Sequence, residues 1–373
     1  MMPLSSIIQT FEAEFLDQYA ERLLPSQRRA LSAMKHCRTA ASPRMWVQCQ
    51  GCERQAFVPH SCGHRACPHC QHHESEQWLA RQLQRQVPGE YFLITFTLPA
   101  EFRTLAWHHQ RLVYDALMQC SWQTLKSFSQ NDRQLQGTPG AISVLHTHSR
   151  RLDYHPHVHV VMPAAALDTR HRLWRTKKTK SKKGQSAYLF PHRALAKVFR
   201  AKMLATLSQT ELTLPACYPA KWVVDCKAVG HGDKALTYLG RYLYRGVIRE
   251  KDIVSCKNGQ VTFRYQDSQT RRMKTRTVAG AEFLWLLLRH VLPRRFRRAR
   301  NFGFLHPNSK RMIQLLHVLL KVHLTEASAW LRARPTLTCP GCGGTMQVIR
   351  TQLPPPRAKR KRTTPVPTGA LVM

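Results

Sequence analysis

Paired cysteines constrain the fold of this 373-residue chain more than any other feature of its sequence. Two Cys-x2-Cys pairs, Cys49/Cys52 and Cys67/Cys70, are separated by fourteen residues. Such a pair forms a tight turn that presents two thiolates to one ion, and two pairs at this spacing suit a tetrahedral site with four sulfur ligands. The spacing therefore predicts that these four cysteines hold one structural zinc ion.

Four further cysteines leave the number of zinc ions open. Cys37 and Cys62, which have several histidines nearby in the sequence, either form part of a second zinc site or pack beside the first. Cys339 and Cys342 form half of a zinc ribbon near the end of the chain. This half ribbon either is completed by a distant residue such as His306 or holds no metal.

The charge of the chain indicates a nucleic acid partner. Lys and Arg total 58 against 21 Asp and Glu, which gives a net charge of +37 and a pI near 10.6. Basic side chains in such excess replace the counterions condensed along phosphates. With 43% apolar residues the chain can still bury a core, which argues against a disordered polycation. We recognise no signal peptide and no membrane span, and we expect a cytoplasmic protein with no membrane partner.

Strands and helices alternate along the middle of the chain without the regular order of a parallel fold. We expect an α+β fold in which a central antiparallel sheet carries helices on one face. The expected strands are 91–98, 141–145, 158–162, 221–226 and 261–265. The expected helices are 4–35 with a break at Pro25, 74–86, 105–129, 192–208, 233–247 and much of the basic segment 279–333.

The same patterns suggest five consecutive regions. A helical and zinc-binding DNA-binding domain spans 1–86, and a catalytic domain spans 87–270. A basic helical DNA-binding region at 271–335 and the half zinc ribbon at 336–350 follow. A flexible basic tail occupies 351–373.

A histidine pair lies on one of the expected strands, in the sequence Tyr154-His-Pro-His-Val-His159. Residues two apart on a strand share a face, so His157 and His159 project together and can bind a divalent metal. Taken alone the pattern is weak in a chain with 20 histidines, and surface or phosphate-contacting histidines are the alternative. A third metal ligand stays undecided among four residues, which are Asp153, Asp225, His231 and Asp233.

A tyrosine pair follows on an expected helix, where Tyr238 and Tyr242 lie one turn apart on one face. From periodicity alone these tyrosines would pack in the core or stack on bases. Together with the histidine pair and the basic charge, they fit DNA strand cleavage. A phenolate can attack a phosphodiester that Mg²⁺ or Mn²⁺ polarises, leaving a covalent phosphotyrosine and a free 3′-hydroxyl.

In this ordered set of motifs, nearly the whole chain resembles the two-tyrosine rolling-circle transposases of bacterial insertion sequences, which are HUH endonucleases. The matching segments include Cys37–Thr39, Ser61–Gln71, Thr95–Pro99, Leu152–His159, Tyr188–Pro191, Phe199–Lys202, Tyr238–Tyr242, His290–Pro293 and Asn301–Leu305. The resemblance implies that His157 and His159 are the metal pair and that Tyr238 and Tyr242 are the nucleophiles. The chain departs from the family pattern at Ala66, at 164–166 and at Tyr244, none of which removes these side chains.

The resemblance also implies the substrate and the partners. The substrate would be single-stranded DNA at the ends of a mobile element, joined to the protein through a 5′-phosphotyrosine. A host helicase would separate the strands, because the chain has no G-x4-G-K-[ST] motif. The protein would work at the bacterial nucleoid, and an oligomer remains open. Two alternatives are a rolling-circle replication initiator or relaxase with the same chemistry, and a non-catalytic zinc-dependent DNA-binding protein.

Overall fold

The computed structural model describes residues 3–70, 72–179, 187–244, 247–267, 270–322 and 336–354, without the side chains of 72–73 and 241–244. The chain divides into two compact units, one of residues 1–35 with 63–334 and the other of residues 36–62 with 335–373. This division differs from the consecutive regions expected from the sequence, because each unit combines distant parts of the chain. No described helix is long and apolar enough to cross a membrane.

The smaller unit is a four-stranded sheet in the order β13-β14-β1-β2. Its strands are β1 (Arg44–Cys49), β2 (Gln55–Pro59), β13 (Leu337–Thr338) and β14 (Thr345–Leu353). Strand β1 pairs antiparallel with both β2 and β14, and Cys49 lies opposite Met346. The segment expected to be a separate half ribbon is therefore part of the same sheet as the N-terminal cysteine pair.

The larger unit contains an antiparallel sheet in the order β7-β6-β4-β5-β3-β8, with β12 paired to β4. The strands are β3 (Tyr91–Thr97), β4 (Thr138–His148), β5 (Tyr154–Pro163), β6 (Ala165–Asp168), β7 (Leu173–Thr176), β8 (Val224–Ala228) and β12 (Ala299–Gly303). β-Branched and aromatic residues make up most of β3 and recur in β4 and β5, which favours extended chain. The α+β class and the antiparallel sheet expected from the sequence are confirmed.

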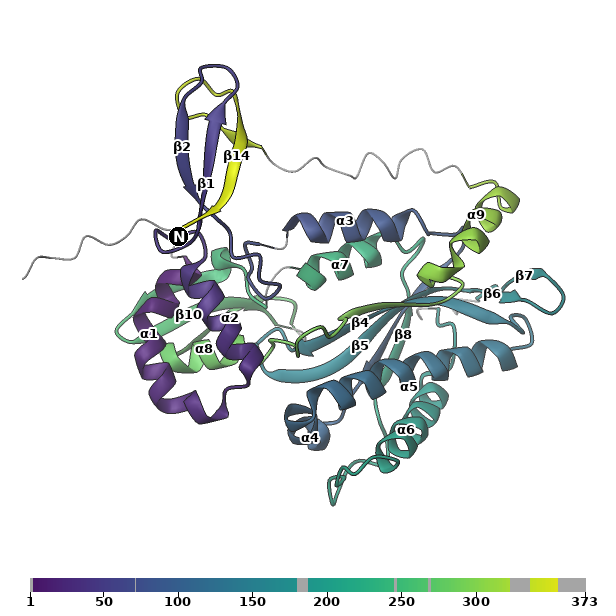
Figure 1. Ribbon diagram of the computed structural model, residues 1–373. Coiled ribbons are helices and arrows are strands. Elements are labelled where there is room, and N and C mark those ends of the chain that lie inside the picture. Colours follow the sequence, from purple (N-terminus) through teal and green to yellow (C-terminus); the bar gives the residue numbers. More distant parts are fainter. Residues whose placement is uncertain are drawn as a thin grey trace, which may run out of the picture. The chain divides into compact units, whose positions relative to one another are not determined.

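Helices cover both faces of this sheet (Figure 1). Ile94 and Phe96 point toward α4 (Arg103–His108), α5 (Gln110–Asn131) and α6 (His192–Ser208). Leu93 and Val161, of the opposite parity, pack with α3 (His72–Leu83), α7 (Asp233–Tyr244) and α9 (Lys310–Leu319). The expectation of helices on one face was wrong, because apolar residues of the second parity, including Ile142 and Val144 beside Leu93 and Val161, give that face a core of its own.

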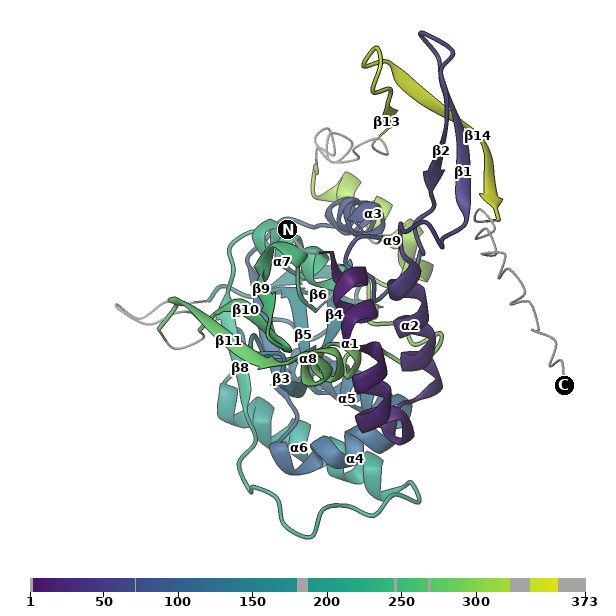
Figure 2. The ribbon, with the colours of Figure 1, turned by 90° about the vertical axis from the view of Figure 1, so that its left-hand side faces the viewer.

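A second helical layer packs beside a small sheet in the same unit (Figure 2). Helices α1 (Leu4–Tyr19) and α2 (Pro25–His36) confirm the break at Pro25, and Tyr19 of α1 stacks on Trp285 of α8 (Gly280–Leu288) at 5.0 Å. The small sheet is β9 (Ile253–Lys257), β10 (Gln260–Gln266) and β11 (Met273–Ala279). Single 3-10 turns occupy Ala20–Arg22, Ala100–Phe102, Glu250–Asp252 and Pro307–Ser309.

The basic segment after α8 is not the continuous helix that its composition suggested. Helix α8 ends at Leu288, and the chain continues in turns that include Pro293 before strand β12 begins at Ala299. Proline removes a backbone donor and interrupts a helix, and pairing with β4 provides hydrogen bonds for the next residues. The arginines of 289–298 are therefore displayed from a loop.

Candidate active site and metal centres

Three histidines from two neighbouring strands meet on the α7 face of the central sheet. One ligand nitrogen of each of His146, His157 and His159 lies within 4.8 Å of the others. The ring centroids of His146 and His159 are 4.4 Å apart, and those of His157 and His159 are 4.8 Å apart. The register of the sheet causes this meeting, because His146 of β4 lies directly opposite His157 of β5.

Hydrogen bonds orient two of these rings. The Nδ1–H of His157 donates to the carbonyl oxygen of His155 at 2.7 Å, which leaves the Nε2 lone pair for a metal. Nδ1 of His159 is hydrogen-bonded to Thr95 Oγ1 of β3 at 2.9 Å, which turns its Nε2 in the same way. Metal-ligating histidines commonly use their second nitrogen in this manner. The donor set fits a divalent cation that DNA oxygens and water would complete.

Burial keeps the histidine group neutral. It lowers the pKa of His157 from 6.5 to about 4. Burial also holds the pKa values of His146 and His159 well below the usual value, and the neighbouring histidines add to the effect. A neutral imidazole is the form that binds a metal, so the group is ready to do so without losing a proton near pH 7.

The burial of these histidines predicts that the free energy of unfolding falls steeply as the pH is lowered. The pKa of His157 is about 4 in the folded state and 6.5 in the unfolded state. Between these pH values the unfolded chain binds a proton that the folded chain does not, so the free energy of unfolding falls as the pH drops toward about 4. His157→Gln should reduce this slope near pH 5 by about 1 kcal/mol per pH unit. Urea unfolding at pH 6.5, 5.5 and 4.5 without added Mg²⁺ or Mn²⁺ measures it. Exposed His108→Gln is the control, and equal slopes for both variants would contradict the expectation.

The sequence analysis missed His146. The strand was expected to end at Leu145, whereas β4 continues to His148 and carries a second alternating pair, His146 and His148, beside the first. That repeated alternation was the available signal. The four residues considered as a third ligand do not belong to the described histidine group; Asp153, for example, forms ion pairs with Arg276 and Arg151.

Tyr238 faces the histidine group from helix α7. Its ring centroid lies 6.3 Å from that of His159, and its side chain is 40% exposed. An exposed tyrosine close to a metal-binding group is accessible to a polymeric substrate. Tyr242 lies one turn further along α7, and its side chain falls outside the described part of the chain.

Close packing between α3 and α7 fixes the position of the tyrosine helix. A Cβ atom at Gly240 would lie 3.4 Å from Trp78 and Leu79 of α3, and the Gly240 carbonyl accepts a hydrogen bond from Ser75 Oγ at 2.5 Å. Glycine between the two tyrosines thus lets the helices approach closely. Helix α7 is held against α3 on the same face of the sheet as the histidines.

A cavity of about 480 Å³ opens in front of Tyr238. Its walls include His148 and Arg150 from the end of β4 and Arg264 and Tyr265 from β10. Arg150 donates to Gln266 Oε1 at 3.2 Å across it. A hollow with guanidinium and aromatic groups beside an exposed tyrosine suits a nucleic acid strand, because arginine binds phosphate and aromatic rings stack on bases.

The cysteine pairs combine differently from the expectation based on spacing. Two groups bring their sulfur atoms within 4.8 Å of one another, namely Cys49, Cys52, Cys339 and Cys342, and Cys37, Cys62, Cys67 and Cys70. The prediction of one site from Cys49, Cys52, Cys67 and Cys70 was therefore wrong, and His306 is not needed to complete the half ribbon. The cause is the pairing of β1 with β14, which joins segments about 300 residues apart, a contact that local spacing does not reveal.

The first cysteine group has the geometry of a zinc site. Sγ of Cys49 lies 3.4 Å from that of Cys342, and Sγ of Cys52 lies 3.6 Å from that of Cys339. Sulfurs bound to one tetrahedral zinc ion at ~2.3 Å are about 3.8 Å apart, whereas a disulfide is ~2.0 Å long. The backbone N–H of Gly51 donates to Cys49 Sγ at 3.3 Å, and the equivalent bond from Gly341 to Cys339 is 3.4 Å.

The grouping predicts how many zinc ions each cysteine variant loses. The wild type should bind two zinc ions per chain, and Cys49→Ser and Cys342→Ser should each remove one. The double variant should also lose only one, because both thiolates belong to the same site. Cys67→Ser should lose the other ion. Atomic absorption on purified protein measures the ratio, with exposed Cys217→Ser as the control. Loss of two ions from the double variant would contradict this grouping.

Two family models match this chain, one over its N-terminal part and one over its central part. Residues 140–312 match the family model described as "Putative transposase", and residues 7–98 match the model described as "Transposase zinc-binding domain". The first range contains the histidine group and Tyr238, and the second contains the cysteines from Cys37 to Cys70. No solved structure matches the chain.

Two curated relatives agree with these matches. The protein named "Putative transposase y4qJ" of Sinorhizobium fredii is 31% identical over 306 residues, which cover 76% of this chain and 75% of the relative. The transposase for insertion sequence element IS801 of Pseudomonas savastanoi pv. phaseolicola is 28% identical over 265 residues, which cover 68% and 63% respectively. The chain belongs to this family of insertion-sequence transposases with an IS91-type zinc-binding domain.

Proposed function

We propose that this transposase cleaves and rejoins single-stranded DNA at the ends of a mobile element through a covalent 5′-phosphotyrosine. The observation that carries the proposal is the placement of Tyr238 beside the group of His146, which is buried, and His157 and His159, which are partly buried, at 6.3 Å between the Tyr238 and His159 rings. A nucleophile next to a metal-binding group is the arrangement that phosphodiester transfer requires.

The reaction conserves the energy of the bond it breaks. The Tyr238 phenolate oxygen attacks the scissile phosphorus, the bond from phosphorus to the 3′-oxygen breaks, and the departing 3′-oxygen takes a proton. A divalent ion, Mg²⁺ or Mn²⁺, would polarise the phosphate and stabilise charge on its oxygens when bound. His146, His157 and His159 would hold that ion, and Thr95 would orient His159.

A second tyrosine allows two successive transfers. Rejoining follows when a free 3′-hydroxyl attacks the phosphotyrosine and releases the phenolate, so no ATP is consumed. Tyr242, one turn after Tyr238, would take the second strand, as rolling-circle transposition requires. Both roles rest on the family resemblance and on the position of the two residues on α7.

DNA contacts would extend beyond the active site. The net charge of +37 supplies enough basic groups to follow a backbone over many phosphates. The zinc-bound cysteine groups and the arginine-rich loop 289–298 would hold the element ends, and a host helicase would separate the strands. The protein would work in the bacterial cytoplasm at the nucleoid.

A denaturing gel tests the proposal. The purified protein is incubated with single-stranded oligonucleotides that span the DNA flanking its gene, with Mg²⁺, Mn²⁺ or neither. We expect a protein–DNA adduct that survives denaturation and forms only with a divalent ion. Specific binding without any adduct, from protein shown to be folded and zinc-loaded, would instead support a zinc-dependent DNA-binding protein.

A further inference from the structure

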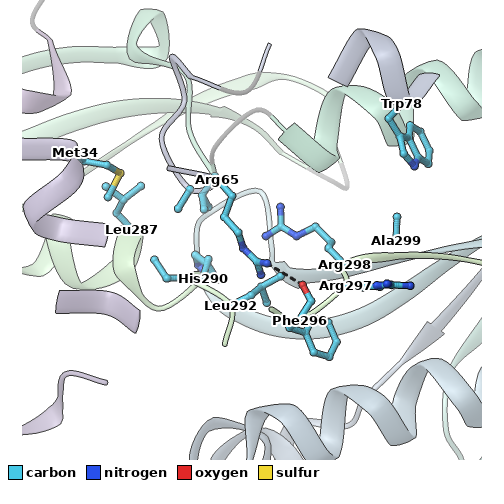
Figure 3. Close-up of a pocket in the computed structure, with 13 residues that line it drawn as sticks. Met34, Arg65, Trp78, Leu287, His290, Leu292, Phe296, Arg297, Arg298 and Ala299 are labelled. Carbon is cyan, nitrogen blue, oxygen red and sulfur yellow. Dashed lines mark hydrogen bonds between the residues drawn. The ribbon is translucent and has the colours of Figure 1, made fainter. Parts of the chain in front are cut away.

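A second cavity, of about 280 Å³, is lined in part by the loop that follows α8. Figure 3 shows Arg65 and Arg298 extending into this space from different segments of the chain, with Arg297 near its edge. Part of the cavity wall is apolar and is formed by the side chains of Phe296, Trp78 and Met34. The described residues that line the cavity include three arginines and no carboxylate.

Hydrogen bonds fix the side chain of Arg65 and the main chain at Arg298. Arg65 Nη1 donates to the carbonyl oxygen of Phe296 at 2.8 Å. This hydrogen bond joins two segments that line the cavity. The carbonyl oxygen of Arg298 accepts from the backbone N–H of Leu145 at 2.9 Å, immediately before strand β12 begins. A neutral carbonyl acceptor orients Arg65 without cancelling its charge.

The cavity adjoins the histidine group. Leu145, which fixes the backbone of Arg298, directly precedes His146. His290, which lines the cavity, has its ring centroid 5.1 Å from that of His148, which lies two residues after His146 on β4. Val247 lines both this cavity and the one in front of Tyr238. A strand lying at the tyrosine could therefore continue past the histidines to the arginines.

Several guanidinium groups that line one hollow give it a positive potential, which attracts an anion. Arginine forms two parallel hydrogen bonds to phosphate oxygens, and such charge-assisted bonds are stronger than neutral ones. A lone small anion would leave the apolar wall of Trp78, Met34 and Phe296 unused, whereas a nucleotide in a strand also offers sugar and base. The lining thus favours a phosphodiester within single-stranded DNA.

We propose that Arg65 and Arg298 form a phosphate-binding subsite that holds a backbone phosphate of the DNA strand close to the scissile one. This inference rests on the proposed function, because it assumes a single-stranded DNA substrate. The subsite would position the strand so that the scissile phosphate lies between Tyr238 and the histidine group. Arg65 and Arg298 would then be positioning residues that do not contact the reacting atoms.

Neutral phosphates provide the test. Oligonucleotides of the cleavable strand are made with a single methylphosphonate at successive positions, and their affinities are measured by fluorescence anisotropy. The protein carries Tyr238→Phe and Tyr242→Phe, so that no cleavage interferes. Arg65→Gln and Arg298→Gln are introduced into this background, and exposed Arg193→Gln, on α6 at the opposite face of the central sheet, is the control.

One methylphosphonate, within a few nucleotides of the cleavage position, should weaken binding to the parent protein about tenfold. The same replacement should cost little in Arg65→Gln and Arg298→Gln, and each variant should lower the slope of log affinity against log salt by about 0.7. Arg193→Gln should leave the methylphosphonate effect at that position unchanged. Arg298→Lys, which keeps the charge, should recover part of the affinity if the variant is folded.

Two results would overturn the subsite. If every methylphosphonate weakened binding to the variants as much as to the parent protein, the arginines would not contact a particular phosphate. If Arg193→Gln behaved like Arg298→Gln, the loss of affinity would reflect the net charge of the protein rather than a particular contact. Either result would leave an adduct with wild-type protein untouched, so the failure of the subsite and the failure of the proposed function are distinguishable.

Discussion

Replacing both Tyr238 and Tyr242 with Phe should abolish covalent adduct formation, with a loss of rate on the order of 10⁴-fold or more. Phenylalanine keeps the ring, and with it the packing of α7, but has no oxygen to attack phosphorus. Each single variant should retain part of the reaction, because the proposed mechanism uses one tyrosine for each strand transfer. Single-turnover reactions on a labelled oligonucleotide, stopped in denaturant, measure the rates.

The control for this experiment is Tyr188→Phe, an exposed tyrosine whose ring contacts His192 rather than the histidine group. Its rate should equal that of the wild type. DNA binding by the double variant should also remain, because the phenol oxygens contribute little to a contact dominated by phosphate charge. A double variant that formed the adduct at the wild-type rate would show that neither tyrosine is the nucleophile.

His146→Ala should raise the Mn²⁺ concentration needed for half-maximal cleavage by about 10- to 100-fold, which is the loss of affinity typical of a weakened metal site. The reason is that His146 supplies one of three ligand nitrogens that lie within 4.8 Å of one another. High concentrations of Mn²⁺ should recover part of the rate, because His157 and His159 remain. Titration of adduct formation with Mn²⁺ and with Mg²⁺ measures the effect.

His155→Ala is the matched control for this variant. His155 lies on the same strand as His157, but its Nδ1 is hydrogen-bonded to Arg103 at 2.8 Å and it stands outside the metal-binding group. Its metal dependence should be close to that of the wild type. Equal metal dependence for His146→Ala and His155→Ala, with both proteins folded, would contradict the three-histidine site.

Local sequence patterns predict several of the strands and helices of the larger unit, including β3, β5 and α7, but not β12. They predict the site only in part. Alternation on β5 predicted that His157 and His159 share a face, and helical spacing placed Tyr238 and Tyr242 on α7. The meeting of these elements depends on sheet order. His146 became a neighbour only because β4 pairs with β5 in this register.

The grouping of the cysteines could not be predicted from their spacing in the sequence. Spacing favours partners that are close in sequence, and it therefore grouped Cys49 with Cys67. The structure instead groups Cys49 with Cys339 and Cys342, because β14 pairs with β1 in the smaller unit. That pairing gains its stability from backbone hydrogen bonds and from buried residues such as Val47 and Met346. Neither contribution has a signature in the spacing of the cysteines.

Mass spectrometry of the trapped adduct tests the central claim most directly, because the two tyrosines fall on different tryptic peptides. Cleavage after Lys234, Arg241 and Arg245 separates residues 235–241, which contain Tyr238, from residues 242–245, which contain Tyr242. After digestion with trypsin and nuclease, we expect a nucleotide linked through a 5′-phosphate to one or both of these peptides, on Tyr238 or Tyr242. A nucleotide attached to any other residue, or an oligonucleotide cleaved with no covalent link to the protein, would contradict the phosphotyrosine mechanism.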